Sequence, residues 1–154
     1  MKLETVKITN FRGISECAEV NFKDLTAIVG KNDVGKSTIL EALDIFFNGN
    51  SAESKLGAMD INQYVRKKCD GKIDIEIACV FSDIPQGDIV LDDSASTSLN
   101  NEGLAVDGKL EIVKIYPNAG KAKVYVRAKY PNVGGAENLF LCKNTDLTRL
   151  STFE

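Results

Sequence analysis

A glycine-rich pattern ending in Lys-Ser restricts the fold of this chain more than any other feature of its sequence. The stretch IVGKNDVGKSTIL, residues 28–40, matches G-x-x-x-x-G-K-[ST] through Gly30, Gly35, Lys36 and Ser37. In loops of this type, backbone N–H groups and the N-terminus of the following helix surround phosphate groups. Such a loop requires a strand before it and a helix after it, so the pattern predicts an α/β fold.

The residues on either side of the loop fit this requirement. Leu25–Val29 is a continuous apolar run, which predicts a strand that is buried on both faces and leads into the loop. After the loop, apolar residues recur at the i, i+4 and i+7 spacing of an amphipathic helix, and Gly49 follows as a stop signal. The apolar positions are Ile39, Leu43 and Phe46, with Ala42 beside them.

The motif also predicts the ligands and the residues that bind them. Lys36 is expected to reach the β- and γ-phosphates, and the Ser37 hydroxyl is expected to be a ligand of Mg²⁺. We therefore expect ATP and Mg²⁺; the guanine-reading pattern Asn-Lys-x-Asp is absent, but this does not prove ATP over GTP. The loop residues predicted to contact the nucleotide are Gly30, Lys31, Asn32, Asp33, Val34, Gly35, Lys36, Ser37 and Thr38.

The 154-residue chain is expected to form one domain in four parts. These are a P-loop unit at 1–50, a loop with a short helix at 51–71, antiparallel strands at 72–131 and the start of a continuing segment at 132–154. Within the first part, β-branched residues predict two further strands, one running through Asn10 and one at 18–22.

The third part contains three β-rich runs, in which apolar and polar residues alternate. This alternation predicts antiparallel strands with one exposed face. The turn NAGK at 118–121 predicts a hairpin between the last two runs, whereas the polar stretch at 92–108 is predicted to be a mobile excursion. The three runs are residues 72–81, 109–117 and 121–131.

Composition excludes several other functions. The net charge of −3 argues against a strongly basic nucleic-acid footprint, although a local basic patch can lie within an acidic total. The sequence has no His and its four Cys form no C-x-x-C pair, which excludes the usual zinc sites and His-dependent nucleophilic catalysis within it. No stretch approaches the roughly 20 apolar residues of a membrane span, so we expect a cytoplasmic protein without membrane contact.

Hydrolysis of ATP would need a second acidic group on Mg²⁺. IVLDD, residues 89–93, resembles an apolar strand that ends in two acids, Asp92 and Asp93, although a solvated strand end is an alternative interpretation. A self-contained P-loop kinase or GTPase would use these acids, but the antiparallel strands disfavour that class. An inert interaction module that retains the loop is a further alternative.

Three stretches carry a resemblance to a known family: ITNFRGI at 8–14, LTAIVGKNDVGKSTILEALDIFF at 25–47 and IDIEIACVFSDI at 73–84. Together they resemble the N-terminal ATPase segment of the OLD (overcoming lysogenisation defect) family of ATP-dependent endonucleases. More distantly, they resemble the RecF and SMC group of ABC-type ATPases. The resemblance implies a P-loop lobe of the ABC type with an added antiparallel sheet, and it implies that this lobe is incomplete.

The resemblance adds residues and partners to the prediction. It implies that Asn10, Phe11 and Arg12 lie near the nucleotide and that Asn32 and Asp33 belong to a variant loop. It also implies self-association through the ATPase head, DNA binding and cleavage by other domains including a Toprim nuclease, and a role in phage defence or DNA processing. An accessory defence protein is a further implied partner.

Several family motifs are missing from these residues. No Ser-Gly-Gly signature follows the loop, the Walker B acids and the Toprim metal cluster are unassigned, and Gln63 or Gln86 only imitates the Q-loop glutamine. We therefore expect the segment alone to lack a complete active site and leave its catalytic residues unassigned. A RecF- or SMC-like DNA repair ATPase or clamp without nuclease activity is the alternative function.

Overall fold

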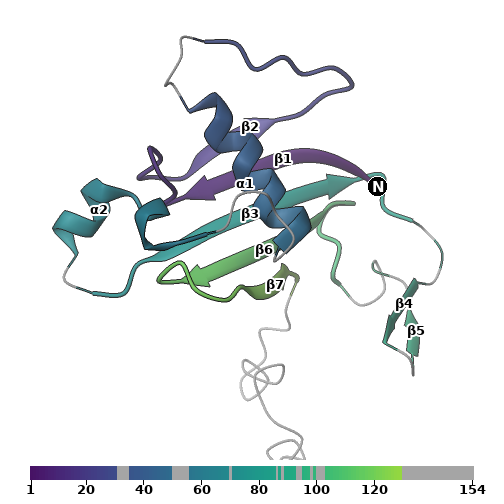
Figure 1. The fold of residues 1–154 in the computed structure, drawn as a ribbon. Coiled ribbons are helices and arrows are strands. Elements are labelled where there is room, and N and C mark those ends of the chain that lie inside the picture. The colour runs from purple at the N-terminus through teal and green to yellow at the C-terminus, as the bar shows by residue number, and fades with distance from the viewer. Residues whose placement is uncertain are drawn as a thin grey trace, which may run out of the picture.

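The computed structural model describes residues 1–30, 35–49, 56–69, 71–85, 87, 89–92, 95–97, 99 and 103–129. A five-stranded antiparallel sheet, in the order β2-β1-β3-β6-β7, forms its centre, and α1 lies across one face of this sheet (Figure 1). The elements in chain order are β1 (Lys2–Thr9), β2 (Ala18–Asn21), α1 (Lys36–Asn48), the 3-10 helix η2 (Ala58–Asp60), α2 (Gln63–Lys68), β3 (Asp74–Ser82), β4 (Ile89–Asp92), β5 (Ala95–Thr97), β6 (Leu110–Pro117) and β7 (Lys123–Arg127).

The hydrophobic core lies between the sheet and α1. Strand β3 occupies the middle of the sheet, and Ile75, Ile77 and Cys79 on it are fully buried. They belong to one cluster with Ala42, Ile45 and Phe46, the buried residues of α1. Because burial of one large apolar side chain contributes about 1.5–3 kcal/mol, this layer is the main source of stability for the lobe. The predicted helix and the sequence spacing that indicates it are confirmed.

The C-terminal end of α1 is attached to β6 by two polar side chains. Lys114 Nζ donates a hydrogen bond to the Phe46 carbonyl oxygen at 2.6 Å, and the Tyr116 hydroxyl donates one to the Ile45 carbonyl oxygen at 3.4 Å. The last carbonyl groups of a helix have no partner in the next turn and carry partial negative charge. Lys114 therefore satisfies one of these groups with a charge of the favourable sign and fixes the position of α1 on the sheet.

The predicted strand before the loop is wrong for the structure as described. Leu25–Val29 forms no strand, and Leu25 and Val29 are 90% and 87% exposed. A strand buried on both faces needs neighbouring strands that supply backbone hydrogen bonds. Among the described residues no strand pairs with this segment, so its apolar run does not become part of a sheet.

The antiparallel strands of the third part are confirmed, with one difference at the edge. Strands β6 and β7 form the predicted hairpin, and the left-handed φ angles of Asn118 (51°) and Ala119 (57°) make its turn. All five residues of β7 are exposed, although alternation predicts one buried face. As the last strand of the sheet, β7 extends beyond the area that α1 covers (Figure 1).

The polar stretch at 92–108 contains more structure than predicted. Its described part includes β5, which pairs with β4 in a separate two-stranded antiparallel sheet. Leu99 is buried and packs with Ile84 and Leu110 in a second, smaller hydrophobic cluster. Residues 132–154, predicted to begin a further segment, lie outside the described part of the chain.

Candidate nucleotide-binding site

The N-terminus of α1 presents backbone N–H groups without a side-chain cap. Gly35 precedes the helix with φ +86° and ψ 10°, a left-handed conformation that glycine adopts without the Cβ penalty of other residues. Among the described residues no side chain caps this end, and the first turn contains no acidic residue. The first N–H groups of a helix have no intrahelical partner and lie at its positive end. This end of α1 can therefore bind an anion.

Lys36 brings the two ends of the loop together. Its Nζ donates a hydrogen bond to the Gly30 carbonyl oxygen at 2.5 Å, so the ammonium group lies at the loop that the motif predicts. A Cβ atom placed on Gly30 would lie 4.0 Å from the Lys36 side chain, in ordinary contact. A small side chain at this position would therefore fit beside the lysine among the described atoms.

The next two residues carry hydroxyl groups at the same end of the helix. Ser37 is exposed and Thr38 is half-buried, in the first turn of α1. Ser37 can thus offer an oxygen to Mg²⁺, and the donor set of lysine, hydroxyl and backbone N–H groups fits a nucleotide phosphate with a bound magnesium ion. The predicted loop residues Lys31, Asn32, Asp33 and Val34 lie outside the described residues.

The two predicted site residues on the N-terminal turn have defined partners of their own. Asn10 and Arg12 both have left-handed φ angles, 59° and 48°. Asn10 Nδ2 donates to the Asp74 carbonyl oxygen at 2.9 Å, and the Arg12 guanidinium forms ion pairs with Glu41 of α1 and Asp60 of η2. Their predicted contact with nucleotide remains a prediction, because these side chains would have to exchange partners to make it.

Phe11 belongs to the core. Its side chain is fully buried, and the Arg12 guanidinium carbon lies 5.3 Å from the centroid of its ring. The aromatic ring therefore supports the turn that carries Arg12 and is not available to stack on an adenine in this arrangement.

Three polar residues that sequence reasoning missed hold this turn in place. Asp60 accepts from the Gly57 N–H and pairs with Arg12, whereas Asn62 caps α2 by accepting from the N–H groups of Tyr64 and Val65 at 3.0 and 3.1 Å. Asn62 also donates to the Arg12 carbonyl oxygen at 2.7 Å. Glu41 is the third. An Asn immediately before a short helix is the one signal in the sequence that indicates such a cap.

The other candidates for a metal or catalytic role are not brought to the loop. Asp92 ends β4 in the separate two-stranded sheet, and Gln63 is the exposed first residue of α2. Asp93 and Gln86 lie outside the described residues. Among the residues that the structure describes, no group of three or more Cys, Asp or Glu side chains is placed to hold a metal ion.

None of the described helices is long and apolar enough to cross a bilayer.

Comparisons with known proteins identify the family and the fold. The sequence profile of the family described as AAA ATPase domain matches residues 1–153. The uncharacterised protein MJECL10 of Methanocaldococcus jannaschii is 44% identical over 52 residues, which is 34% of this chain and 24% of that protein. The matched region thus spans about a quarter of that relative.

Two solved structures of SMC proteins are similar in fold. One, described as "Structural biochemistry of ATP-driven dimerization and DNA stimulated activation of SMC ATPases", aligns with a TM-score of 0.53 at 15% identity over 100% of this chain and 93% of that chain. The other, an SMC head bound to the C-winged helix domain of ScpA, aligns with a TM-score of 0.50 at 18% identity over 82% and 35%. At these identities the likeness concerns the fold, which is that of an SMC-head-type P-loop ATPase.

Proposed function

Because this chain belongs to the AAA ATPase domain family, we propose that it binds ATP with Mg²⁺ at the loop between Gly30 and α1. One observation carries the proposal: the uncapped N-terminus of α1, Gly35 in its left-handed conformation and the Lys36 ammonium all meet at this loop. Three features that favour a phosphate thus occur at one place.

Each residue has a proposed role in binding. The N–H groups of the first turn of α1 bind phosphate oxygens, and Lys36 exchanges the Gly30 carbonyl for the β- and γ-phosphates. The Ser37 hydroxyl is the proposed ligand of Mg²⁺, which when bound neutralises phosphate charge. The proposed site further includes Thr38, the loop residues 31–34, and the side chains of Asn10 and Arg12.

For the whole protein, we propose an OLD-like ATP-dependent DNA endonuclease. In this proposal ATP binding drives self-association of the ATPase lobes and controls DNA cleavage by a separate Toprim domain. The protein acts in the cytoplasm, in phage defence or DNA processing. An accessory defence protein is a further proposed partner. Support comes from the three stretches at 8–14, 25–47 and 73–84, and from a structural neighbour that is described by ATP-driven dimerisation.

A RecF- or SMC-like ATPase without nuclease activity is the second candidate. The fold likeness to SMC heads favours it. The two candidates differ in one measurable property, since only the first predicts cleavage of DNA that depends on both ATP and a divalent metal. Absence of such cleavage by the complete protein would favour the second candidate.

Isothermal titration calorimetry with Mg·ATP tests the binding site. We expect Lys36→Ala to abolish measurable binding, because Lys36 is the side-chain cation that the described residues place at the loop. Lys121→Ala is the matched control, since Lys121 is an exposed lysine in the turn between β6 and β7. Equal affinity of the wild type and Lys36→Ala would overturn the assignment.

Hydrolysis is a separate question. ABC-type sites are completed by the signature motif of a second subunit, and among the described residues no group of three or more Cys, Asp or Glu side chains is placed to hold a metal ion. We therefore expect the chain by itself to turn over ATP very slowly. A fast rate that is lost in Lys36→Ala would contradict the proposal that the site is shared between subunits.

A further inference from the structure

A cluster of basic side chains lies on and just after α2, in a chain whose net charge is −3. We call Arg66, Lys67, Lys68 and Lys72 the basic α2 surface; all four are exposed. The helix stands out at one end of the sheet, at the opposite end from the N-terminus (Figure 1). A local positive field on an acidic protein thus occupies a part of the surface that a partner can reach.

The charges of the basic α2 surface are not used in ion pairs within the described residues. Arg66 Nη1 donates to the Ala58 carbonyl oxygen at 3.4 Å, a long contact that leaves its other N–H groups available. Lys68 Nζ lies 4.2 Å from the centroid of the Tyr64 ring. Asp70, the one acid in this stretch of sequence, lies outside the described residues.

Helix stability explains only part of this cluster. Arg66, Lys67 and Lys68 lie in the last turn of α2, where a cation offsets the negative end of the helix dipole by about 0.3–1 kcal/mol. Lys72 lies beyond the helix and does not serve this purpose. Three cations on a six-residue helix also repel one another, so dipole compensation alone does not require them.

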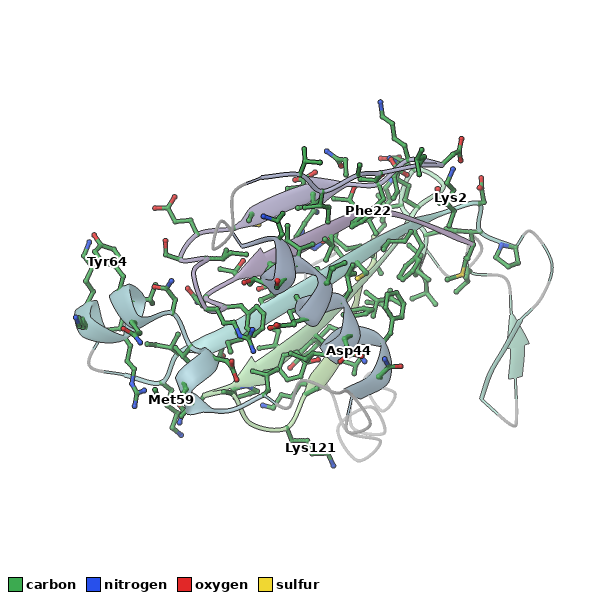
Figure 2. The ribbon with its side chains drawn as sticks, turned by 45° about the horizontal axis from the view of Figure 1, so that its top comes forward. Lys2, Phe22, Asp44, Met59, Tyr64 and Lys121 are labelled. Carbon is green, nitrogen blue, oxygen red and sulfur yellow. The ribbon has the colours of Figure 1, made fainter. Side chains whose placement is uncertain are left out.

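The surface next to these cations is concave and offers further contacts. A groove of about 220 Å³ is lined by Met59, Ile61, Gln63, Arg66 and Lys67. A second groove of about 460 Å³ shares Met59, Ile61 and Gln63 with it and is also lined by Arg12, Asp60, Asn62 and Tyr64. Met59 and Tyr64 are 78% and 59% exposed and lie at the same end of the molecule in Figure 2. The grooves thus combine apolar side chains with amide and hydroxyl groups beside Arg66 and Lys67, and the Asp60 carboxylate in the second groove is paired with Arg12.

We propose that the basic α2 surface binds the phosphate backbone of a nucleic acid. Clustered Lys and Arg side chains that neutralise successive phosphates give sequence-independent binding, and amide and hydroxyl groups at their side add hydrogen bonds to the backbone. This surface would give the ATPase lobe its own contact with nucleic acid, in addition to contacts made by other domains. The proposal does not depend on nucleotide binding at the P-loop, so either can fail without the other.

An anionic membrane is a less suitable partner for the same charges. A helix that lies on a bilayer presents an apolar face to the lipid. The one aliphatic residue of α2, Val65, packs against the main core, and the remaining residues of the helix are polar, aromatic or charged. No apolar helix face is therefore left to enter the lipid.

Fluorescence anisotropy with a short labelled DNA duplex of mixed sequence, measured without ATP over a range of salt concentrations, tests the proposal. We expect wild-type binding that weakens steeply with salt. The variant Lys67→Gln/Lys68→Gln removes two cations. Each phosphate contact contributes about −0.9 to the slope of log K against log [salt], so the slope of the variant should be less negative than that of the wild type by about 2. Affinity at low salt should fall at least tenfold.

A matched variant separates this local effect from a change in net charge. Lys23→Gln/Lys121→Gln removes the same number of charges from exposed lysines that are not part of the basic α2 surface, and its slope should equal that of the wild type. Thermal unfolding followed by circular dichroism checks that both variants are folded. Three results would each overturn the proposal: no duplex binding by the wild type at low salt, equal slopes for the two variants, or binding to anionic lipid vesicles but not to DNA at the same salt.

Discussion

Arg12 and Asp60 form an ion pair, with Arg12 Nε 2.8 Å from Asp60 Oδ1, although 48 positions separate them in the sequence. The backbone reinforces this contact, because the Arg12 N–H donates to the Asp60 carbonyl oxygen at 2.6 Å. The same guanidinium pairs with Glu41. One side chain thus connects the turn after β1, the helix that follows the P-loop and the segment that leads into α2.

This connection predicts a measurable coupling between Arg12 and Asp60. Both side chains are partly shielded from water, with 35% and 16% of their surface exposed. We expect Asp60→Asn to lower the free energy of unfolding by about 1–2 kcal/mol, since a hydrogen bond to a charged group contributes about 1.5–3 kcal/mol. A double-mutant cycle with Arg12→Gln, followed by urea unfolding, should give a coupling energy above 0.5 kcal/mol. Additive effects would show that the pair contributes nothing to stability.

Arg12 also distinguishes a structural role from a nucleotide-binding role. If Arg12 contacts nucleotide only after leaving Glu41 and Asp60, Asp60→Asn should leave Arg12 freer and should not weaken Mg·ATP binding. Arg12→Gln should weaken it. Calorimetry on the two variants checks both expectations, and an unchanged affinity in Arg12→Gln would restrict this residue to holding the fold together.

The side chain of Asn62 is predicted to be needed for α2. It is 6% exposed, caps two N–H groups of the helix and donates to the Arg12 carbonyl oxygen. Loss of a helix cap costs about 0.5–2 kcal/mol, and Asn62→Ala should cost at least this much because it also leaves a carbonyl group without its donor. Asn62→Asp retains the cap but not the donor and should be intermediate. Chemical denaturation of the three proteins gives the comparison.

Gly35→Ala should affect both stability and binding. At φ +86° an alanine is strained by about 1–2 kcal/mol, although no atom of the described residues lies within 4 Å of the added Cβ. The helix start is expected to shift in order to relieve this strain, and the first-turn N–H groups would move with it. We therefore expect a lower melting temperature and at least tenfold weaker Mg·ATP binding. Gly13→Ala, where the φ angle is not left-handed and no atom lies within 4 Å, is the matched control.

Two buried groups predict a loss of stability at alkaline pH. Burial raises the pKa of the Cys79 thiol from 9.0 to about 12 and the pKa of the Tyr116 hydroxyl from 10.0 to about 12. Above pH 9 the unfolded chain releases these protons before the folded chain does, so the unfolded state binds fewer protons and stability falls as pH rises. Below pH 9 neither group contributes a slope.

Unfolding free energies measured on both sides of pH 9 check this sign. Below pH 9, Cys79→Ala should be less stable than the wild type because of the small cavity it leaves. Between pH 9 and 10 this variant should lose much less stability than the wild type, because in the unfolded chain the thiol releases more of its proton over this interval than the Tyr116 hydroxyl does. An unchanged slope in this variant would assign the alkaline loss to other groups.

The exposed run before the loop gives a contrast with the core. Leu25 is 90% exposed, whereas Ile77 is fully buried on β3. We expect Ile77→Ala to cost about 2–5 kcal/mol and Leu25→Ala to change stability by less than about 0.5 kcal/mol. Urea unfolding of both variants measures this, and a large loss in Leu25→Ala would show that the run packs against the rest of the chain.

The sequence by itself determined those features that depend on neighbouring residues. The pattern from Gly30 to Ser37 indicates the loop, the spacing of Ile39 and Leu43 indicates the helix, and NAGK at 118–121 indicates the hairpin. Each of these is a short-range property, because periodicity and turn preference act over a few residues. Taken together, the same local patterns indicate a P-loop ATPase, which agrees with the match to the AAA ATPase domain family.

Tertiary structure alone decided the features that depend on distant partners. Arg12 pairs with Asp60 across 48 positions, and Asn62 donates to the Arg12 carbonyl oxygen across 50 positions. No local pattern specifies either contact. The run Leu25–Val29 shows the reverse case, since its apolar composition predicts a buried strand and yet a strand forms only where a neighbour supplies hydrogen bonds and covers its faces. The local sequence limits which secondary structure a segment can adopt. The neighbours of the segment in space determine whether its polar groups are hydrogen-bonded and its apolar groups are buried.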